Sequence, residues 1–200
     1  MAMWDDRFDT PDYVYGKAPA AFLTDHAGWL TPGARGLAVA DGEGRNSTFM
    51  AQRGLSVTAM DSSPNAIAKA RALAAERGVR VDHVEASITD WDWAPAAFDV
   101  VAAIFIQFLR PAERAAVFAG MARTLAPGGT LLLHGYTPEQ IAFGTGGPRN
   151  PDFLYTEALL RGQFAGLEIV ELRSYEREIS EGVGHSGRSA LIDMVAKKPA

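Results

Sequence analysis

The chain has 200 residues, of which 48% are hydrophobic, and a formal net charge of −5 at pH 7. A chain of this length buries roughly 70% of the surface that its unfolded form exposes, which suits one domain with a sizeable core. The negative charge argues against a general nucleic-acid-binding protein, because phosphate neutralisation needs a clustered basic surface. The sequence has no cysteine, which excludes disulfides, thiolate metal ligands and cysteine nucleophiles. A small-molecule ligand fits this composition better than a nucleic acid.

The N-terminal sequence MAMWDDRFDTPDYVYGK carries several acidic residues and lacks the apolar core of a signal peptide. No stretch of the sequence approaches about 18 consecutive apolar residues, the length that a membrane-spanning helix needs. We therefore predict a cytoplasmic protein without a membrane partner, either a monomer or a homodimer.

From Gly36 onward, short apolar runs alternate with helix-like segments, which is typical of βαβ units and a largely parallel sheet. The helix 64–77 is well delimited, because Ser63 offers an N-cap oxygen, Pro64 suits the first helical position and Gly78 suits the end. The other predicted elements are strands at 36–40, 56–60, 80–84, 98–105 and 130–135, and helices at 46–53, 111–125 and 158–164.

Two further strands are predicted at 168–175 and 189–196, separated by about a dozen loop-like residues, too few for a helical crossover. They should therefore pair antiparallel. The predicted fold is an α/β, Rossmann-like, doubly wound and mostly parallel sheet of about seven strands, with the last strand antiparallel and helices on both faces. The single domain 1–200 would comprise an N-terminal cap or lid (1–30), a cofactor-binding core (36–135), and a late loop with a strand pair (136–200).

The loop VADGEGRNS, residues 39–47, places Gly42 and Gly44 between a buried strand and the start of a helix. Glycines at such points let a ligand approach the backbone beside the amides of a helix N-terminus, although a tight turn of an ordinary α/β protein has the same appearance. Asp61 ends the second strand 19 residues after Gly42. A carboxylate there can accept hydrogen bonds from both ribose hydroxyls of a nucleoside cofactor, or act as a turn or N-cap residue.

A nicotinamide-dependent oxidoreductase would share these features. However, the third glycine of the dinucleotide pattern is replaced by Ser47, and no Tyr-x-x-x-Lys pair for a proton relay is present. Both observations count against that enzyme class.

Taken in order, the motifs resemble the class I S-adenosylmethionine-dependent methyltransferases, and among them the small proteins similar to tellurite-resistance and thiopurine methyltransferases. The resemblance spans nearly the whole chain. It rests on WxxRF at 4–8, YVYG at 13–16, GEGRNS at 42–47, VTAMD at 57–61, FDVV at 98–101, LAPGGTLLL at 125–133, FGTGGP at 143–148 and EGVGHSG at 181–187. The chain departs from the usual pattern at Ala38 and Ala40, where an acidic residue and a glycine are usual, and at Ser87, where aspartate is frequent.

The resemblance implies S-adenosylmethionine as cofactor and S-adenosylhomocysteine as product. The loop 42–44 would line the methionine part, Asp61 would hold the ribose, Ser87-Ile88 would flank the adenine, and Ile104-Phe105 would face the methyl group. The predicted cofactor-binding residues are Tyr15, Ala40, Asp41, Gly42, Gly44, Arg45, Asn46, Asp61, Ser62, Ser87, Ile88, Ile104 and Phe105.

Methyl transfer from a sulfonium needs no metal, and positioning supplies most of the catalysis, although a neutral thiol or hydroxyl acceptor benefits from a base. His185, on a glycine-rich loop, is a candidate base or substrate-binding residue; a solvated loop histidine is the alternative. The predicted acceptor-side residues are Tyr15, Gln107, Arg149, His185 and Arg188. The two arginines are equally compatible with surface charges, and Gln107 with a turn cap.

The resemblance favours methylation of a small soft nucleophile, a thiol or a chalcogen compound. Oxygen, nitrogen or carbon acceptors in small metabolites remain open, as does a nicotinamide-dependent oxidoreductase. A non-catalytic cofactor-binding module is the third reading, suggested by Ala38 and Ala40.

Overall fold

A computed structural model describes residues 2–182 and 185–200. One seven-stranded sheet organises the chain, with strand order β3-β2-β1-β4-β5-β7-β6. The strands are β1 (Arg35–Val39), β2 (Ser56–Asp61), β3 (Val81–Glu85), β4 (Phe98–Ile104), β5 (Leu125–Tyr136), β6 (Glu168–Ser180) and β7 (Ser186–Lys197). The helices are α1 (Ala2–Phe8), α2 (Ala21–Asp25), α3 (Arg45–Gln52), α4 (Pro64–Glu76), α5 (Pro111–Thr124), α6 (Gln140–Phe143) and α7 (Glu157–Gln163), with short 3₁₀ turns η1 (Ala27–Trp29) and η2 (Pro151–Phe153).

The first five strands pair in parallel, whereas β7 runs antiparallel to both β5 and β6. The order changes direction at β1, which pairs with β2 on one side and β4 on the other. Ligands bind to open α/β sheets at the carboxyl end of the strands beside such a switch point. The predicted Rossmann-like fold is confirmed, including the antiparallel pair at the end of the chain.

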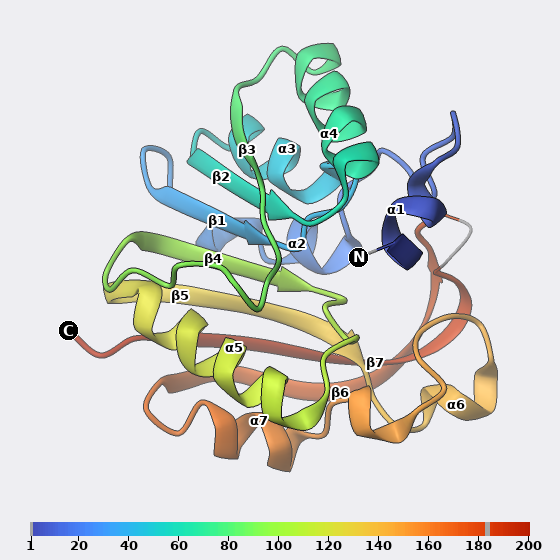
Figure 1. Cartoon of the computed structure of the whole chain (residues 1–200). Coiled ribbons are helices and arrows are strands. Elements are labelled where there is room, and N and C mark those ends of the chain that lie inside the picture. Colours follow the sequence, from blue (N-terminus) through green and yellow to red (C-terminus); the bar gives the residue numbers. More distant parts are fainter. Residues whose placement is uncertain (1, 183–184) are drawn as a thin grey trace.

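Alternating side chains of the central strands enter two cores, one on each face of the sheet. On one face, Leu37 and Val39 of β1 belong to a core that includes Phe118 of α5 and Phe164, which follows α7. On the other face, Ala38 belongs to a core completed by Phe22 and Leu23 of α2, Leu30 after η1, and Met50 of α3. Figure 1 shows α5 and α7 covering the lower side of the sheet, and α4 beside α3 at its upper end. Helices therefore cover both faces, as predicted.

Capping residues fix the boundaries of α4 as the sequence indicates. The Ser63 hydroxyl accepts a hydrogen bond from the Ala66 amide at 3.1 Å, and Pro64 occupies the first turn. The helix ends at Glu76, and Gly78 follows in the left-handed conformation. This N-cap lies two residues after Asp61, so the start of α4 is fixed directly beside the end of β2.

Three strand boundaries differ from the prediction by more than one residue. β5 begins at Leu125 rather than residue 130, because Leu125 pairs with Phe98 across a bulge before the regular register resumes at Thr130. β6 continues to Ser180 and β7 begins at Ser186, so the connection is much shorter than the predicted dozen residues. The extension of β6 is an exposed edge with mostly charged side chains, a composition that hides a strand from hydrophobicity patterns.

The N-terminal segment lies against the carboxyl edge of the sheet. Glu43, which is 3% exposed, accepts hydrogen bonds from the backbone amides of Val14 and Tyr15, both at 3.1 Å. Asp5 accepts hydrogen bonds from the Ser63 hydroxyl and the Asn65 amide at 2.6 and 3.1 Å. These contacts hold the segment over the loop after β1. Among the described residues, no helix is long and apolar enough to cross a membrane.

Candidate cofactor and acceptor site

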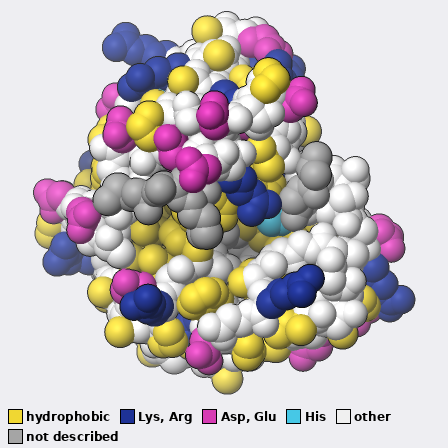
Figure 2. Space-filling model, turned by 45° about the vertical axis from the view of Figure 1, so that its right-hand side comes forward, with side chains coloured by type: hydrophobic (Ala, Val, Ile, Leu, Met, Phe, Trp, Pro, Cys, Tyr) yellow, Lys and Arg dark blue, Asp and Glu magenta, His cyan; other side chains and the backbone are white. Residues whose placement is uncertain are grey.

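A cavity of about 680 Å³ opens at the carboxyl edge of the sheet, between the N-terminal segment, the strand ends and the late loops. Its volume lies within the range of about 300–1,000 Å³ that is typical of small-molecule sites. Figure 2 looks toward this edge and shows a hollow in which hydrophobic side chains, basic side chains and histidine gather. Predicted cofactor residues that line it are Tyr15, Ala40, Asp41, Gly42, Arg45, Asn46, Asp61, Ser62, Ser87, Ile88, Ile104 and Phe105.

Asp61 joins the two loops on which the cofactor prediction rests. One carboxylate oxygen accepts a hydrogen bond from the Gly42 amide at 2.9 Å, and the other accepts one from the Ser63 amide at 2.9 Å. Burial raises the pKa of Asp61, although these backbone hydrogen bonds oppose the shift. The carboxylate therefore lies beside Gly42, whose φ of +61° suits glycine, and its binding of a ribose stays a prediction.

Gly44 does not line the cavity, contrary to its predicted role in cofactor binding. It is the N-cap of α3 with a φ of +86°, and a Cβ there would lie 2.6 Å from the Ala70 Cβ in α4. Its requirement for glycine therefore comes from the packing of α3 against α4.

Asp41 and Ser47 close the loop from inside. Asp41 accepts hydrogen bonds from the Ser47 amide at 3.1 Å and from the Ser47 hydroxyl. Burial raises the pKa of Asp41 to about 7, and the neighbouring Asp61 acts in the same direction, while the bonds from Ser47 oppose them. Serine in place of the third dinucleotide glycine thus orients an acid that lines the cavity.

Two strand ends at the cavity have backbone conformations that are rare for residues other than glycine. Ala40, after β1, has a φ of +47°, and Phe105, after β4, has a φ of +56°. The left-handed conformation costs a non-glycine residue about 1–2 kcal/mol, and such strain is typical of functional sites. At position 40, alanine therefore keeps the backbone geometry that the usual glycine would adopt freely.

One end of the cavity, which we call the acceptor end, is formed by the aromatic rings of Tyr15, Phe105, Tyr136 and His185. The His185 ring stacks on Phe105 at 4.2 Å and on Tyr15 at 4.7 Å, between ring centroids. Its Nδ1 lies 2.5 Å from the hydroxyl of Tyr136, the last residue of β5. These four side chains come from the N-terminal segment, two strand ends and the C-terminal hairpin, so the fold assembles the acceptor end from distant parts of the sequence.

Burial lowers the pKa of His185 to about 3, and the positive charges of Arg45 and Arg7 contribute in the same direction. The imidazole is therefore neutral near pH 7 and a weak proton acceptor. A positively charged sulfonium nearby would lower its basicity further. The geometry favours His185 as a side chain that shapes the acceptor end over the predicted general base.

Arg45, the first residue of α3, is 6% exposed and lines the cavity, close enough for its charge to act on the pKa of His185. Its Nη2 donates to the Glu181 carboxylate at 2.8 Å. Its buried Nη1 has no hydrogen-bond partner among residues 2–182 and 185–200. A buried charged donor without an acceptor is energetically unfavourable, which marks Nη1 as a position for a ligand atom.

Two predicted acceptor residues lie outside the cavity, and the side-chain amide of a third bonds to the backbone. Arg188 is exposed and forms an ion pair with Glu176, and neither Arg188 nor the exposed Arg149 lines the cavity. Gln107 lines it, but its side-chain oxygen accepts from the Tyr136 amide at 2.6 Å and its nitrogen donates to the Tyr136 carbonyl at 2.8 Å. The amide of Gln107 therefore holds the end of β5 in place.

The sequence reasoning missed several lining residues, of which Arg7 and Tyr136 are the most informative. The Arg7 guanidinium lies over the rings of Trp4 and Tyr15, 5.5 and 5.3 Å from their centroids. Only the position of Arg7 in the WxxRF motif could have indicated it. No local signal marks Tyr136, because a tyrosine at the end of a buried strand is ordinary core composition.

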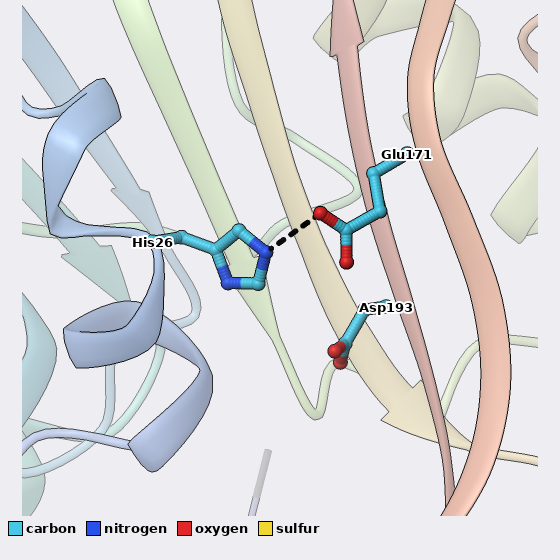
Figure 3. A group of neighbouring side chains, drawn as sticks. All are labelled: His26, Glu171 and Asp193. Atoms are coloured by element: carbon cyan, nitrogen blue, oxygen red, sulfur yellow. Dashed lines mark hydrogen bonds and ion pairs between the residues drawn. The ribbon is translucent and has the colours of Figure 1, made fainter.

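A second polar cluster lies between α2 and the strand pair β6–β7. His26, Glu171 and Asp193 have potential ligand atoms within 4.8 Å of one another, and Figure 3 shows His26 directed at Glu171 with Asp193 beside them. Arg173 bonds both carboxylates, at 2.9 Å to Glu171 and 3.0 Å to Asp193. Because this guanidinium already neutralises the carboxylates that would bind a cation, the cluster is an ion-pair network.

A family model described as a methyltransferase domain matches residues 37–129, which contain the loop after β1, Asp61 and the strand end at Phe105. This part of the chain, slightly less than half of it, is therefore similar to methyltransferase domains. Together with the seven-stranded sheet, this match confirms the resemblance to class I S-adenosylmethionine-dependent methyltransferases.

Curated relatives are similar to this chain over part of their own length. A ubiquinone biosynthesis O-methyltransferase of Xanthomonas campestris is 38% identical over 103 residues, covering 51% of this chain and 43% of that protein. An uncharacterized protein of Mycobacterium tuberculosis is 32% identical over 123 residues, covering 61% of this chain and 44% of that protein. The chain thus spans less than half the length of these relatives.

Solved structures share the fold of nearly the whole chain at low identity. NodS, an N-methyltransferase of Bradyrhizobium japonicum in complex with S-adenosylhomocysteine, has a TM-score of 0.74 and 15% identity over 100% of this chain and 98% of that one. TehB of Haemophilus influenzae has a TM-score of 0.72 and 18% identity over 98% and 65%. A protein described by the conversion of a disulfide bond into a thioacetal group during echinomycin biosynthesis has a TM-score of 0.79 and 19% identity over 98% and 91%.

Proposed function

We propose that the protein transfers a methyl group from S-adenosylmethionine to a small-molecule acceptor, with a thiol or other chalcogen nucleophile as the preferred class. The observation that carries this proposal is that Asp61, the Asp41–Gly42 loop and the aromatic rings around Phe105 all line one cavity. The Asp61 carboxylate can accept hydrogen bonds from the ribose hydroxyls, and the aromatic part of the cavity offers an apolar surface to the acceptor. The family match to residues 37–129 supports the cofactor.

The residues fit a nucleoside sulfonium in three ways. Asp61 and Asp41 supply negative charge beside the loop, Ser87 and Ile88 line the adenine side, and the rings of Tyr15 and Phe105 offer faces that attract cations. When bound, S-adenosylmethionine supplies an electrophilic methyl group. The chain's own contribution is to orient the acceptor beside Phe105 and to exclude water, which is most of what a direct displacement requires.

Sulfur as acceptor atom is supported by two comparisons. The sequence motifs resemble the tellurite-resistance and thiopurine group, and the echinomycin structure concerns chemistry at sulfur. An oxygen acceptor is the second candidate, supported by the ubiquinone biosynthesis O-methyltransferase. The fold alone does not identify the acceptor atom, because proteins with this fold have different activities: a [4+2]-cyclase shares it with a TM-score of 0.70.

Calorimetric titration with S-adenosylmethionine, S-adenosylhomocysteine, NAD and NADP tests the proposed cofactor. We expect saturable binding of the two sulfur nucleosides and none of the nicotinamide nucleotides, because Ser47 replaces the third dinucleotide glycine. Thiols, selenols and catechols are then incubated with S-adenosylmethionine and the methylated products identified by mass spectrometry. Binding of a nicotinamide nucleotide would make the protein an oxidoreductase candidate, and cofactor binding without any product would favour the non-catalytic module.

Replacing His185 with asparagine separates a shaping role from general base catalysis. Loss of a general base costs about 10²–10⁴-fold in rate, so we expect a smaller fall in kcat, with the affinity for S-adenosylhomocysteine unchanged. Because its pKa is about 3, His185 should cause no inflection of kcat/KM between pH 5 and 8. An inflection near pH 6–7 that the variant abolishes would establish His185 as the base; one retained in the variant belongs to another group, such as Asp41.

A further inference from the structure

We propose that the acceptor binds as an organic anion, with its negatively charged group at Nη1 of Arg45 and its flat apolar body against the rings of Phe105 and His185. This inference rests on the proposed function, because it assigns the acceptor end of the same cavity. It adds a charge requirement that neither the fold nor the family match specifies.

The first step is the state of the Arg45 guanidinium. Its side chain is 7% exposed, and one end is held by Glu181, which is 8% exposed and also accepts a hydrogen bond from the Ala21 amide at 2.9 Å. This bond fixes the guanidinium, so its Nη1 is presented in a constant direction. Within the part of the chain that the structure describes, Nη1 has no acceptor. A planar guanidinium with free donors matches a carboxylate or a similar anion.

The second step is the charge of the surroundings. Arg7 lines the same cavity, and both Arg7 and Arg45 act on His185 strongly enough to lower its pKa. Arg7 and Arg45 therefore place positive charge beside His185, while Glu181 pairs with one end of Arg45 and Asp41 also lies within reach of its charge. An anion at Nη1 is attracted by the two arginines.

The third step is shape. Phe105 and His185 are nearly parallel, with an interplanar angle of 16°, and the Tyr15 ring also stacks on His185, at 30°. Flat rings beside a fixed guanidinium provide an apolar surface with one charged position, which suits a planar anion better than a neutral polar molecule. The negative group is either a carboxylate on the acceptor or an ionised thiol that is itself the nucleophile. Either group would accept a charge-assisted hydrogen bond from Nη1 of Arg45.

The test uses full-length protein saturated with S-adenosylhomocysteine and titrated calorimetrically with two pairs of probes, benzoate against benzamide and thiophenolate against thioanisole. Each pair differs in charge with little change of shape. We expect the anion of at least one pair to bind about tenfold or more tightly than its neutral partner. A preference for benzoate identifies a carboxylate, and a preference for thiophenolate alone identifies an ionised thiol. No preference in either pair overturns the proposal.

Two variants connect the preference to Arg45. Arg45→Lys keeps the charge and the pairing to Glu181 but leaves no second nitrogen to face the cavity, so the preference should fall by about tenfold. The double variant Arg45→Met with Glu181→Gln removes both buried charges, which protects folding, and should abolish it. A preference that survives in the double variant overturns the role of Arg45.

The competing explanation is that Arg45 binds the carboxylate of the cofactor itself. It predicts that both variants bind S-adenosylhomocysteine at least tenfold more weakly than the parent. Their affinity for 5′-methylthioadenosine, which lacks that carboxylate, should equal that of the parent. Our proposal assigns Arg45 to the acceptor and not, as the sequence predicts, to the cofactor, so both affinities should stay within about twofold of those of the parent. Failure of the parent protein to bind S-adenosylhomocysteine at all would instead refute the proposed function, and this inference with it.

Discussion

Replacing Asp61 with alanine is expected to raise the Kd of S-adenosylhomocysteine by about 10- to 150-fold, equivalent to about 1.5–3 kcal/mol. This is the range for hydrogen bonds to a charged group. The physical reason is that the carboxylate ends β2 beside Gly42, within the cavity and facing the position that the ribose would occupy. Calorimetric titration of parent and variant measures the change, with thermal unfolding as a check that the variant is folded.

Asp61 also accepts the amides of Gly42 and Ser63, so its removal can loosen the loop without any contact to a ribose. A double-mutant cycle with ligands separates the two effects. Parent and variant are titrated with 5′-methylthioadenosine and with its 2′,3′-dideoxy analogue. If Asp61 holds the hydroxyls, the parent prefers the natural ligand and the variant does not. An equal preference in both proteins would remove Asp61 from the ribose site and leave it as a loop-fixing residue.

Local patterns predicted the parts of the site that depend on one loop. Gly42 and Asp61 could be placed together because a glycine-rich turn and an acidic strand end at a fixed spacing form a known arrangement in parallel sheets. Gly44 shows the limit of such a pattern. The sequence has a glycine there, but only the structure shows that a side chain at this position would collide with Ala70 of α4.

The acceptor end was only partly predictable, because its contacts join distant segments. Arg45 and Glu181 are 136 residues apart, and Tyr136 and His185 are 49 apart. Neither pairing has a spacing signature, since each depends on how the C-terminal hairpin folds back over the sheet edge. The charged exterior of β6 concealed its extension to Ser180, and with it the position from which Glu181 reaches Arg45.

The position of Phe105 depends on a polar network deeper in the fold. His134 of β5 packs against Phe105 with ring centroids 4.7 Å apart and stacks on Phe22 at 4.9 Å. Its Nδ1 lies 2.6 Å from a carboxylate oxygen of Asp193, which is 1% exposed. The other oxygen of Asp193 accepts from Arg173. The network thus fixes the His134 ring, which packs against Phe105 at the acceptor end of the cavity.

Replacing Asp193 with asparagine should therefore be the most destabilising of the substitutions considered. Removing one partner of a buried, hydrogen-bonded charge network costs about 3–5 kcal/mol, a large fraction of the stability of a domain. Urea unfolding measures the loss as a lower midpoint at unchanged slope. The exposed pair of Asp99 with Arg35, at 2.7 Å, provides the matched control, and Asp99→Asn should cost no more than about 1 kcal/mol.

The effect of Asp193→Asn should also depend on pH in a defined direction. Burial alone would raise the pKa of Asp193, but the hydrogen bond to His134 and the pairing with Arg173 outweigh it and lower the pKa below its ordinary value. A carboxyl group with a depressed pKa stabilises the fold fully above its unfolded pKa of about 3.9 and loses this contribution as the pH falls through the folded value. The difference between parent and variant should thus be constant from about pH 5 upward and shrink below about pH 4. A difference that persists undiminished at low pH would mean that packing, not the charge of Asp193, holds His134 beneath Phe105.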